Sequence, residues 1–257
     1  MTPMSVVPML LLSGLTGPPA QFAPAGSDED LPAVAASVDS DFQERLRALD
    51  AGVKGIDDLR ANFEQHRHTP LLRRPLVSNG TVLAVGDRMR WDTMRPHQSS
   101  MLVGDEAVEL YYPEDGLIEM YPVDQGFMDL AGVPMPRLAA LSKRFEVTPI
   151  SPLDLDPHCN TDRYFAMALT PRTEDLRRHV TGVRMLIDGS RSIATKVILS
   201  GPDGDRTEIT FSDIHLNTGV QTDRLKLNVP DGTRRVRPLG TGQDNPGERG
   251  ESRGGTQ

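Results

Sequence analysis

The sequence has few of the groups from which reactive or metal-binding centres are usually built. Cys159 is the only cysteine among 257 residues, which excludes an intramolecular disulfide and a zinc site built on paired cysteines. The P-loop and G-x-G-x-x-G patterns are absent as well, and G-x-S-x-G is absent from residues 1–249, since its one match is at residues 250–254 in the C-terminal tail. These absences count against the common hydrolases, phosphate-binding enzymes and dinucleotide-dependent enzymes.

The chain also lacks an excess of positive charge. It has 28 Lys and Arg residues against 36 Asp and Glu residues, a net charge of -8 and a pI of about 5.3. This balance argues against non-specific binding to nucleic acid or to anionic membrane surfaces. We therefore expect no nucleic-acid partner.

Long hydrophobic runs are missing as well. The apolar run at residues 6–15 is too short to span a bilayer, and Ala23-Pro24-Ala25 follows it as an A-x-A-like cleavage site before Gly26. This pattern predicts a secretory signal peptide at residues 1–25 and a soluble, exported, periplasmic protein. The alternative is a disordered N-terminal tail.

The C-terminal residues 240–257 contain no Leu, Ile, Val or aromatic residue, so we expect them to be disordered. Residues 26–37 are typical of a linker. One folded domain is therefore expected at residues 38–239.

Within that domain the first pattern is helical. Ser40 is a suitable N-cap, and Phe42, Leu46 and Leu49 fall on one face of the helix it would begin. Residues 125–144 also have helical spacing, interrupted by Pro134 and its neighbours, which predicts two short helices joined by a bend.

The remaining patterns favour strands. Apolar and polar residues alternate from Leu59 to Phe63 and again around Trp91, and Asn79-Gly80 is a typical hairpin turn. Later strands are predicted at 164–170, 183–187, 193–199, 206–211 and 225–229. The fold class is therefore mainly β (α+β), an antiparallel sheet with helices as the available cover for its apolar face.

A curved sheet under a loosely packed helical lid can hold an apolar cavity. Its candidate walls, all large and apolar, are Phe63, Met89, Trp91, Leu110, Met120, Phe165, Met167, Met185 and Phe211 on strands, with Phe127, Met128, Leu130, Met135, Leu138 and Leu141 on the cover. Methionine is common at adaptable apolar binding surfaces. The alternative is that these residues form an ordinary filled core.

Several short motifs occur in a fixed order over residues 40–233. They are F-x-Q (63–65), L-L-x-R-P-L-x-S-x-G (71–80), R-W-D-T (90–93), L-V-x-D (102–105), Y-Y-P (111–113), L-T-P (169–171), I-T-F-S-D-I (209–214) and L-N-V-P-D-G (227–232). In order and spacing the sequence resembles the periplasmic outer-membrane lipoprotein carrier family (LolA-like), as a divergent member.

The resemblance implies an incomplete β-barrel of about eleven antiparallel strands, closed by helices that act as a lid over an apolar cavity. Members of this family carry the acyl chains of lipoproteins across the periplasm, from an inner-membrane transporter to an outer-membrane acceptor, as chaperones that make and break no bond. Acyl burial is worth roughly 0.8 kcal/mol per methylene, so such a cargo needs a carrier to cross water. The resemblance thus implies a monomeric carrier, with no cofactor and no metal.

The sequence departs from the family pattern in two places. The Arg-Pro pair that helps to hold the family's lid shut is missing before Trp91, which leaves Arg88 and Arg90 as candidates for lid contacts. The Phe expected after Asp231-Gly232 is replaced by Thr233. These departures bear on the lid and on the identity of the cargo.

Other residue groups have chemical potential of their own. His66 and His68 share a strand face as a possible metal pair, and His158 precedes Cys159 as a possible base beside a nucleophile. The acidic loop with Asp154, Asp156 and Asp162 resembles a calcium loop only in composition, and the pairs Arg73-Arg74 and Arg177-Arg178 could meet phosphate or an anionic head group. For each group the alternative is an ordinary solvated surface, or an inert thiol.

We therefore predict a non-enzymatic periplasmic carrier of lipoproteins or lipids. Two alternatives remain open at this point. One is an envelope scaffold or sensor domain with a filled core, and the other is an envelope enzyme that acts on lipid.

Overall fold

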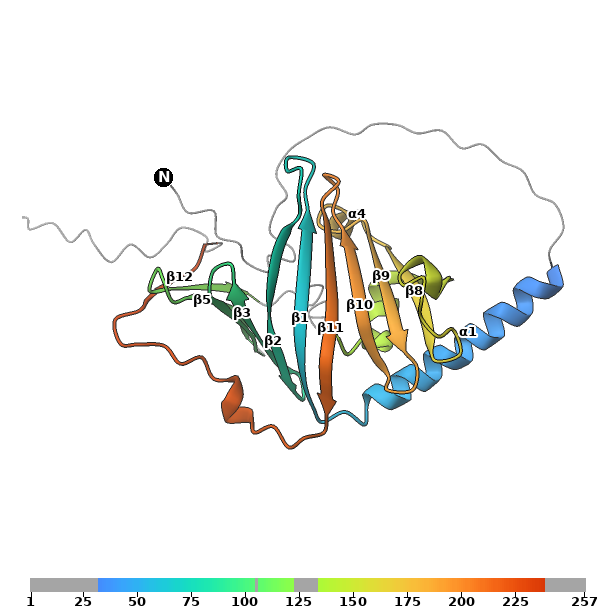
Figure 1. The fold of residues 1–257 in the computed structure, drawn as a ribbon, viewed down its shortest axis with the longest axis horizontal. Coiled ribbons are helices and arrows are strands. Elements are labelled where there is room, and N and C mark those ends of the chain that lie inside the picture. The colour runs from blue at the N-terminus through green and yellow to red at the C-terminus, as the bar shows by residue number, and fades with distance from the viewer. Residues whose placement is uncertain (1–31, 105, 123–133, 239–257) are drawn as a thin grey trace, which may run out of the picture.

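The structure, a computed structural model, describes residues 32–104, 106–122 and 134–238 (Figure 1). Its helical elements are α1 (Pro32–Val53), α3 (Leu138–Arg144), η1 (Pro152–Asp154), α4 (Glu174–Arg177) and η2 (Thr222–Leu225). Its strands are β1 (Asp58–His68), β2 (Leu76–Val85), β3 (Arg88–Arg95), β4 (Ser99–Val103), β5 (Ala107–Tyr112), β6 (Leu117–Pro122), β7 (Phe145–Ile150), β8 (Tyr164–Pro171), β9 (Gly182–Asp188), β10 (Ile193–Ser200), β11 (Arg206–Leu216) and β12 (Arg234–Val236). None of the described helices is long and apolar enough to cross a membrane.

All of the described strands belong to one sheet, in the order β12-β6-β5-β4-β3-β2-β1-β11-β10-β9-β8-β7. Neighbouring strands are antiparallel except for β12, which runs parallel to β6. The terminal strands β12 and β7 are not paired with each other, so the curved sheet stays open. The predicted incomplete antiparallel barrel is confirmed, with 12 strands in place of about eleven.

Alternation along the strands divides the sheet into an apolar inner face and a polar outer face. On β1, Leu59, Ala61 and Phe63 are buried, whereas Arg60 and Asn62 are exposed. The pairing of Phe63 with Phe211 carries the same inner face onto β11. A single cluster of buried apolar residues covers this inner face from β5 to β7 in the order of the sheet. A smaller cluster around Leu155 and Ile198 lies on the outer face.

Helix α1 covers the inner face beside the β8–β10 part of the sheet (Figure 1). Phe42, Leu46, Leu49 and Val53 recur at helical spacing and pack into the core cluster. Ser40 lies inside α1, so its prediction as the N-cap was wrong, because the helix already begins at Pro32, within the expected linker. Proline suits the first turn of a helix, where its missing N–H has no partner to lose.

The predicted hairpin turn at Asn79-Gly80 was wrong, because both residues lie inside β2. The chain reverses earlier, over residues 69–75, and the β2–β3 pairing contains a bulge at Met94 of β3, opposite Asn79 and Gly80. A Cβ on Gly80 would lie 1.9 Å from the carbonyl oxygen of Asp92. Glycine is therefore required here by close backbone approach, and not by a turn.

Two further predictions need correction. The predicted strand at 225–229 is absent, because this segment crosses the outer face of the sheet, where the guanidinium of Arg90 donates to the carbonyls of Arg224 and Lys226. Of the two predicted helices at 125–144, only α3 falls among the described residues, since residues 123–133 lie outside them. Phe145 begins β7 and does not continue the helix.

Candidate functional site

Most of the predicted cavity walls lie together on the inner face. Buried residues of the main core cluster include Phe63, Met89, Trp91, Leu110, Phe165, Met167, Met185 and Phe211 from strands, with Met135, Leu138 and Leu141 from the cover. Met120 is opposite Glu109 in the β5–β6 pairing and so lies on the other face from Leu110. Phe127, Met128 and Leu130 lie outside the described residues.

An aromatic group at the centre of the sheet packs closely. The ring of Trp91 lies edge-on to Phe63 at 5.0 Å and to Phe211 at 5.7 Å between centroids. Its indole N–H donates to the Sδ of Met89. Edge-to-face aromatic contacts of this kind favour a fixed arrangement over an adaptable surface. In the described part of the sheet, these predicted walls contact one another.

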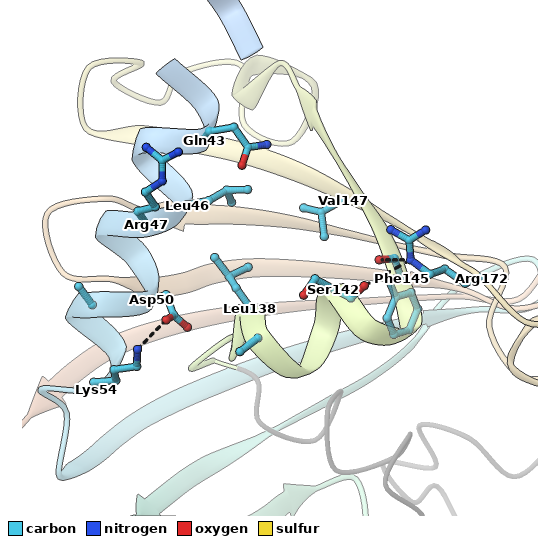
Figure 2. A pocket seen from close by; sticks show the side chains of 12 residues that line it. Gln43, Leu46, Arg47, Asp50, Lys54, Leu138, Ser142, Phe145, Val147 and Arg172 are labelled. Carbon is cyan, nitrogen blue, oxygen red and sulfur yellow. Dashed lines mark hydrogen bonds and ion pairs between the residues drawn. The ribbon is translucent and has the colours of Figure 1, made fainter. Parts of the chain in front are cut away.

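Open space lies beside this packed region, in a groove between α1, α3 and the edge strand β7 (Figure 2). Its volume is about 510 Å³, within the range of roughly 300–1,000 Å³ that is usual for ligand sites. The apolar lining comes from all three elements and consists of Leu46, Ala51, Leu138, Ala139, Phe145 and Val147. We call this space the α1–α3 groove.

The rim of the α1–α3 groove is polar and carries basic groups. The Nε of Arg172 donates to the backbone carbonyls of Phe145, at 3.1 Å, and Ser142 (Figure 2). Lys54 pairs with Asp50 at 2.8 Å, and the exposed Arg47 stands on the same side of α1. An apolar floor under a basic rim suits an amphiphile with an anionic head better than a wholly polar ligand.

Sequence reasoning found Leu138 but missed most of this groove. The signal for Leu46 was present, because it lies on the apolar stripe of α1, one turn from Phe42. Phe145 and Val147 alternate along β7, but Phe145 was interpreted as continuing the helical pattern of residues 125–144. Arg172 gave no signal, because nothing local shows that its guanidinium reaches the end of α3.

Helix α3 is fastened to the sheet at its N-terminal side. Arg137 forms an ion pair with Asp87 and donates to the carbonyl of Gly86, 3.3 Å away, in the β2–β3 turn. The backbone N–H of Ala194 donates to the carbonyl of Pro134 at 2.8 Å, beside a bulge in β10. These two contacts hold residues 134–137 across the inner face.

The two arginines predicted for lid contacts lie elsewhere. Arg88 is exposed at the start of β3. Arg90 pairs with Asp92 and holds the C-terminal segment through the carbonyl of Lys226, 2.5 Å away. The arginine that joins a described helix to the β2–β3 turn is therefore Arg137, which sequence reasoning did not identify.

A second cavity, of about 560 Å³, lies between α1 and the β9–β10 turn. Its polar side is occupied by Arg163, whose guanidinium binds the buried carboxylate of Asp188 through two hydrogen bonds. Arg45 lies 6.0 Å from the ring of Phe165 and pairs with Asp41. Both of these guanidinium groups are already paired with carboxylates, whereas in the described chain Arg172 of the α1–α3 groove binds only backbone carbonyls, so this cavity is a weaker candidate for an anionic ligand.

A polar group also lies on the inner face, on β6. Glu119 is paired with Leu110 and accepts hydrogen bonds from the hydroxyls of Tyr112 and Tyr121 at 3.2 and 3.0 Å. Burial, and then the hydrogen bond to Glu119 and the charge of that carboxylate, raise the pKa of Tyr121 to about 12. Tyr121 therefore stays protonated as a donor at neutral pH.

The other residue groups singled out in the sequence form no reactive centre among the described residues. His66 binds Glu64 at 2.7 Å, and the described chain has no group of three or more His, Cys, Asp or Glu residues that could hold a metal ion. Burial, together with the charge of Asp156, raises the pKa of the Cys159 thiol, which packs against the Leu155 cluster. A raised pKa disfavours the nucleophilic thiolate.

In the acidic loop, the polar side chains cap turns. Asp156 accepts the backbone N–H of His158 at 3.0 Å, and Asn160 accepts that of Asp162 at 2.9 Å. Local hydrogen bonds of this kind account for the loop without a bound ion.

Comparison with known proteins gives similar folds at low identity. No described protein family and no curated protein sequence matches the chain. Among solved structures, an uncharacterised conserved protein from Thermus thermophilus is 11% identical with a TM-score of 0.48, and the match covers 77% of this chain and 99% of that one. A LolA superfamily protein from Nitrosomonas europaea is 12% identical with a TM-score of 0.40, covering 71% and 96%. The Mycobacterium tuberculosis lipoprotein LppX is 10% identical with a TM-score of 0.39, covering 69% and 96%.

Proposed function

We propose that this protein is a LolA-like periplasmic carrier, which binds the acyl chain of a lipid or lipoprotein in the α1–α3 groove and across the adjoining inner face. The observation that carries the proposal is the groove itself, with an apolar floor shared by two helices and an edge strand under a basic rim. An acyl chain would lie on the floor near Leu46 and Val147. An anionic head would meet Arg47 and Arg172.

The energetic argument follows from the cargo. Each methylene moved from water into an apolar site contributes roughly 0.8 kcal/mol, so even part of an acyl chain gains several kcal/mol in such a groove. The groove must also let the chain leave again. Helix α3 is short, and its tie to the β2–β3 turn rests on the half-exposed Arg137, whose ion pair with Asp87 is of a kind worth only about 0–1 kcal/mol. Such a tie can be opened at modest cost.

The wider assignments belong to the same proposal. Residues 38–239 would form the carrier domain, preceded by a signal peptide at 1–25 and a linker at 26–37, and followed by the tail at 240–257. The signal peptide and the whole of that tail lie outside the described residues. A donor in the inner membrane and an acceptor at the outer membrane would complete the route of a monomeric carrier.

A scaffold or sensor with a filled core is the second candidate, and a specific observation favours it. The side chains of Phe63, Trp91 and Phe211 are buried and contact one another, as the side chains of a filled core do. The two candidates differ in one respect that can be measured, which is the uptake of an acyl chain.

The test is native mass spectrometry of protein purified from a periplasmic extract, followed by titration of the delipidated protein with a fluorescent fatty acid. Val147→Trp fills the α1–α3 groove, whereas Thr148→Trp adds the same bulk on the exposed, opposite side of β7. We expect V147W to weaken uptake at least about tenfold and T148W to leave it unchanged. If the purified protein carries no acylated species and the delipidated protein takes up no fatty acid, the carrier proposal is wrong. The scaffold or sensor with a filled core would then be the better candidate.

A further inference from the structure

The turn between β1 and β2, residues 69–75, exposes two adjacent leucines. The side chain of Leu71 is 91% exposed and that of Leu72 is 45% exposed. Exposed single leucines are common, but of the five large hydrophobic side chains exposed in the described chain, four lie at this end of the sheet. The other two are Val77 at the start of β2 and Met94 at the end of β3, and only Leu153 lies elsewhere.

This turn projects beyond the neighbouring strand ends (Figure 1). It is held in place by the N–H of Leu72, which donates to the carbonyl of Thr69 at 3.1 Å. Pro70 packs against the β10–β11 turn, where a Cβ on Gly204 would lie 3.3 Å from its ring. The leucines are therefore held outward by a supported turn.

Basic residues stand directly beside these leucines. Arg73 and Arg74 follow Leu72, both are exposed, and neither has an ion-pair or hydrogen-bond partner within the described chain. Residues 65–75 contain no acidic side chain. In the adjacent turn Asp205 is paired with Arg67 at 3.1 Å, which leaves Asp203 as the exposed carboxylate there. A chain with a net charge of -8 thus presents a locally basic, apolar projection.

We propose that Leu71, Leu72, Arg73 and Arg74, here called the docking tip, bind the surface of an anionic phospholipid bilayer. The leucines would enter the boundary between head groups and acyl chains, and the guanidinium groups would bind lipid phosphates. Apolar side chains flanked by arginine are suited to this interface, because each group meets its preferred layer. Arginine also matches phosphate in a forked geometry.

The shape of the tip favours a bilayer over a protein partner. A projecting turn with two neighbouring leucines offers little area for a stable protein interface, which usually buries about 800 Å² on each side. A fluid bilayer needs no complementary pocket. The docking tip shares no residue with the α1–α3 groove, so its binding to a bilayer would not depend on an acyl cargo.

The experiment is co-sedimentation of the full chain with vesicles of phosphatidylcholine alone or mixed with phosphatidylglycerol. We expect binding to the anionic vesicles that weakens as salt is raised. Arg73→Gln with Arg74→Gln should reduce the partition coefficient roughly 30-fold, from about 1 kcal/mol for each basic side chain near an anionic surface. Leu71→Ser with Leu72→Ser should reduce it at least about tenfold.

Matched controls separate the tip from general effects. Arg60→Gln with Arg88→Gln removes the same charge from exposed positions at the other end of the strands, and Leu153→Ser removes the exposed leucine on η1. Both should bind vesicles as the wild type does. Every chain keeps the apolar run at residues 6–15, so binding through that run would leave both tip variants unchanged and would overturn the proposal. Equal binding to neutral and anionic vesicles would overturn it as well, and fatty-acid uptake, measured separately, decides the carrier proposal.

Discussion

Asp58 and Asp188 are the buried carboxylates of the described chain, and each is held by donors close to it in space. Asp58, at the start of β1, accepts the backbone N–H groups of Thr218 and Gly219 at 2.9 and 2.8 Å. Asp188, at the end of β9, binds Arg163 and the N–H of Ser190. Both residues therefore fix strand ends to neighbouring loops.

The pKa values of these two carboxyls lie below the ordinary value of 3.8. Burial raises the pKa of Asp58, but the hydrogen bonds from Thr218 and Gly219 outweigh burial. Burial likewise raises the pKa of Asp188, and the hydrogen bonds from Arg163 and Ser190, with the charge of Arg163, lower it further than burial raises it. In both cases the folded state favours the ionised form.

These lowered pKa values make the stability of the fold depend on pH in the acid range. A carboxyl whose pKa is lower in the folded chain stabilises the fold above its unfolded pKa, and that contribution is lost as the pH falls through the folded pKa. We expect the free energy of unfolding in urea to fall as the pH drops below about 3.8. Asp58→Asn with Asp188→Asn should lower stability at neutral pH by about 2–5 kcal/mol and flatten this acid limb. If the free energy of unfolding of this variant fell with acid pH as steeply as that of the wild type, Asp58 and Asp188 would not be the source of the pH dependence.

At the scale of elements, several strands were predictable because alternation over five or more residues is a strong signal. The strands β1, β8, β9 and β10 lie close to their predicted positions. The errors came from residues whose local preference was overridden by distant contacts. Asn79-Gly80 has the composition of a turn, but its place is fixed by strand β3 and the carbonyl of Asp92. Leu225 and Leu227 alternate as in a strand, but Leu225 lies in η2 against β2 and β3, whose edges are already paired with other strands.

The close approach at Gly80 gives a prediction for β2. Gly80→Ala places a methyl group 1.9 Å from a carbonyl oxygen and 2.8 Å from the ring of Phe63, so β2 and β3 must separate. We expect a loss of about 2–4 kcal/mol in the free energy of unfolding, measured by urea denaturation. Thr81→Ala, the next residue on the half-buried outer side, should cost less than about 1 kcal/mol. If both variants lost the same free energy of unfolding, any substitution in β2 would destabilise the fold, and the close approach of Gly80 to Asp92 would not be the cause.

The candidate site was predictable only in part, for a related reason. The apolar faces of the helices and the sheet can be recognised from periodicity, and so Leu138 and Leu141 of α3 were found. The α1–α3 groove exists because α3 is set at a distance from α1, and the periodicity of the sequence does not predict the distance between two helices. Arg137 and Arg172 bind backbone carbonyls, which every residue offers, so the sequence contains no mark of their partners.

At the scale of the whole molecule, an open sheet has two edges to protect. Strand β12 covers the edge of β6 through three paired residues, and Arg235 binds Glu109 on the neighbouring strand β5 at 3.3 Å. At the other edge, β7 carries Pro149, which cannot donate to a further strand. Edges protected in these ways resist pairing with another chain.

Truncation tests the protection of the β6 edge. A chain ending at Pro230 lacks β12, so β6 is free to pair with a second molecule. We expect dimers or larger species in size-exclusion chromatography with light scattering at concentrations where the whole chain is monomeric. A chain ending at Pro238 keeps β12 and should stay monomeric. If both truncated chains associate to the same extent, then the residues after 238 prevent association, and the pairing of β12 with β6 is not what prevents it.

The fastening of α3 has a kinetic consequence. The segment is bonded to β10 through Pro134 and continues directly into β7 at Phe145, so α3 stays attached at both ends when Arg137 leaves Asp87. Its return is then an intramolecular event, for which the effective concentration of the missing partner is on the order of millimolar. Reclosure would be first order and independent of protein concentration. A molecule in which this tie had opened would therefore reset without a partner, at a rate that does not depend on how many other copies are present.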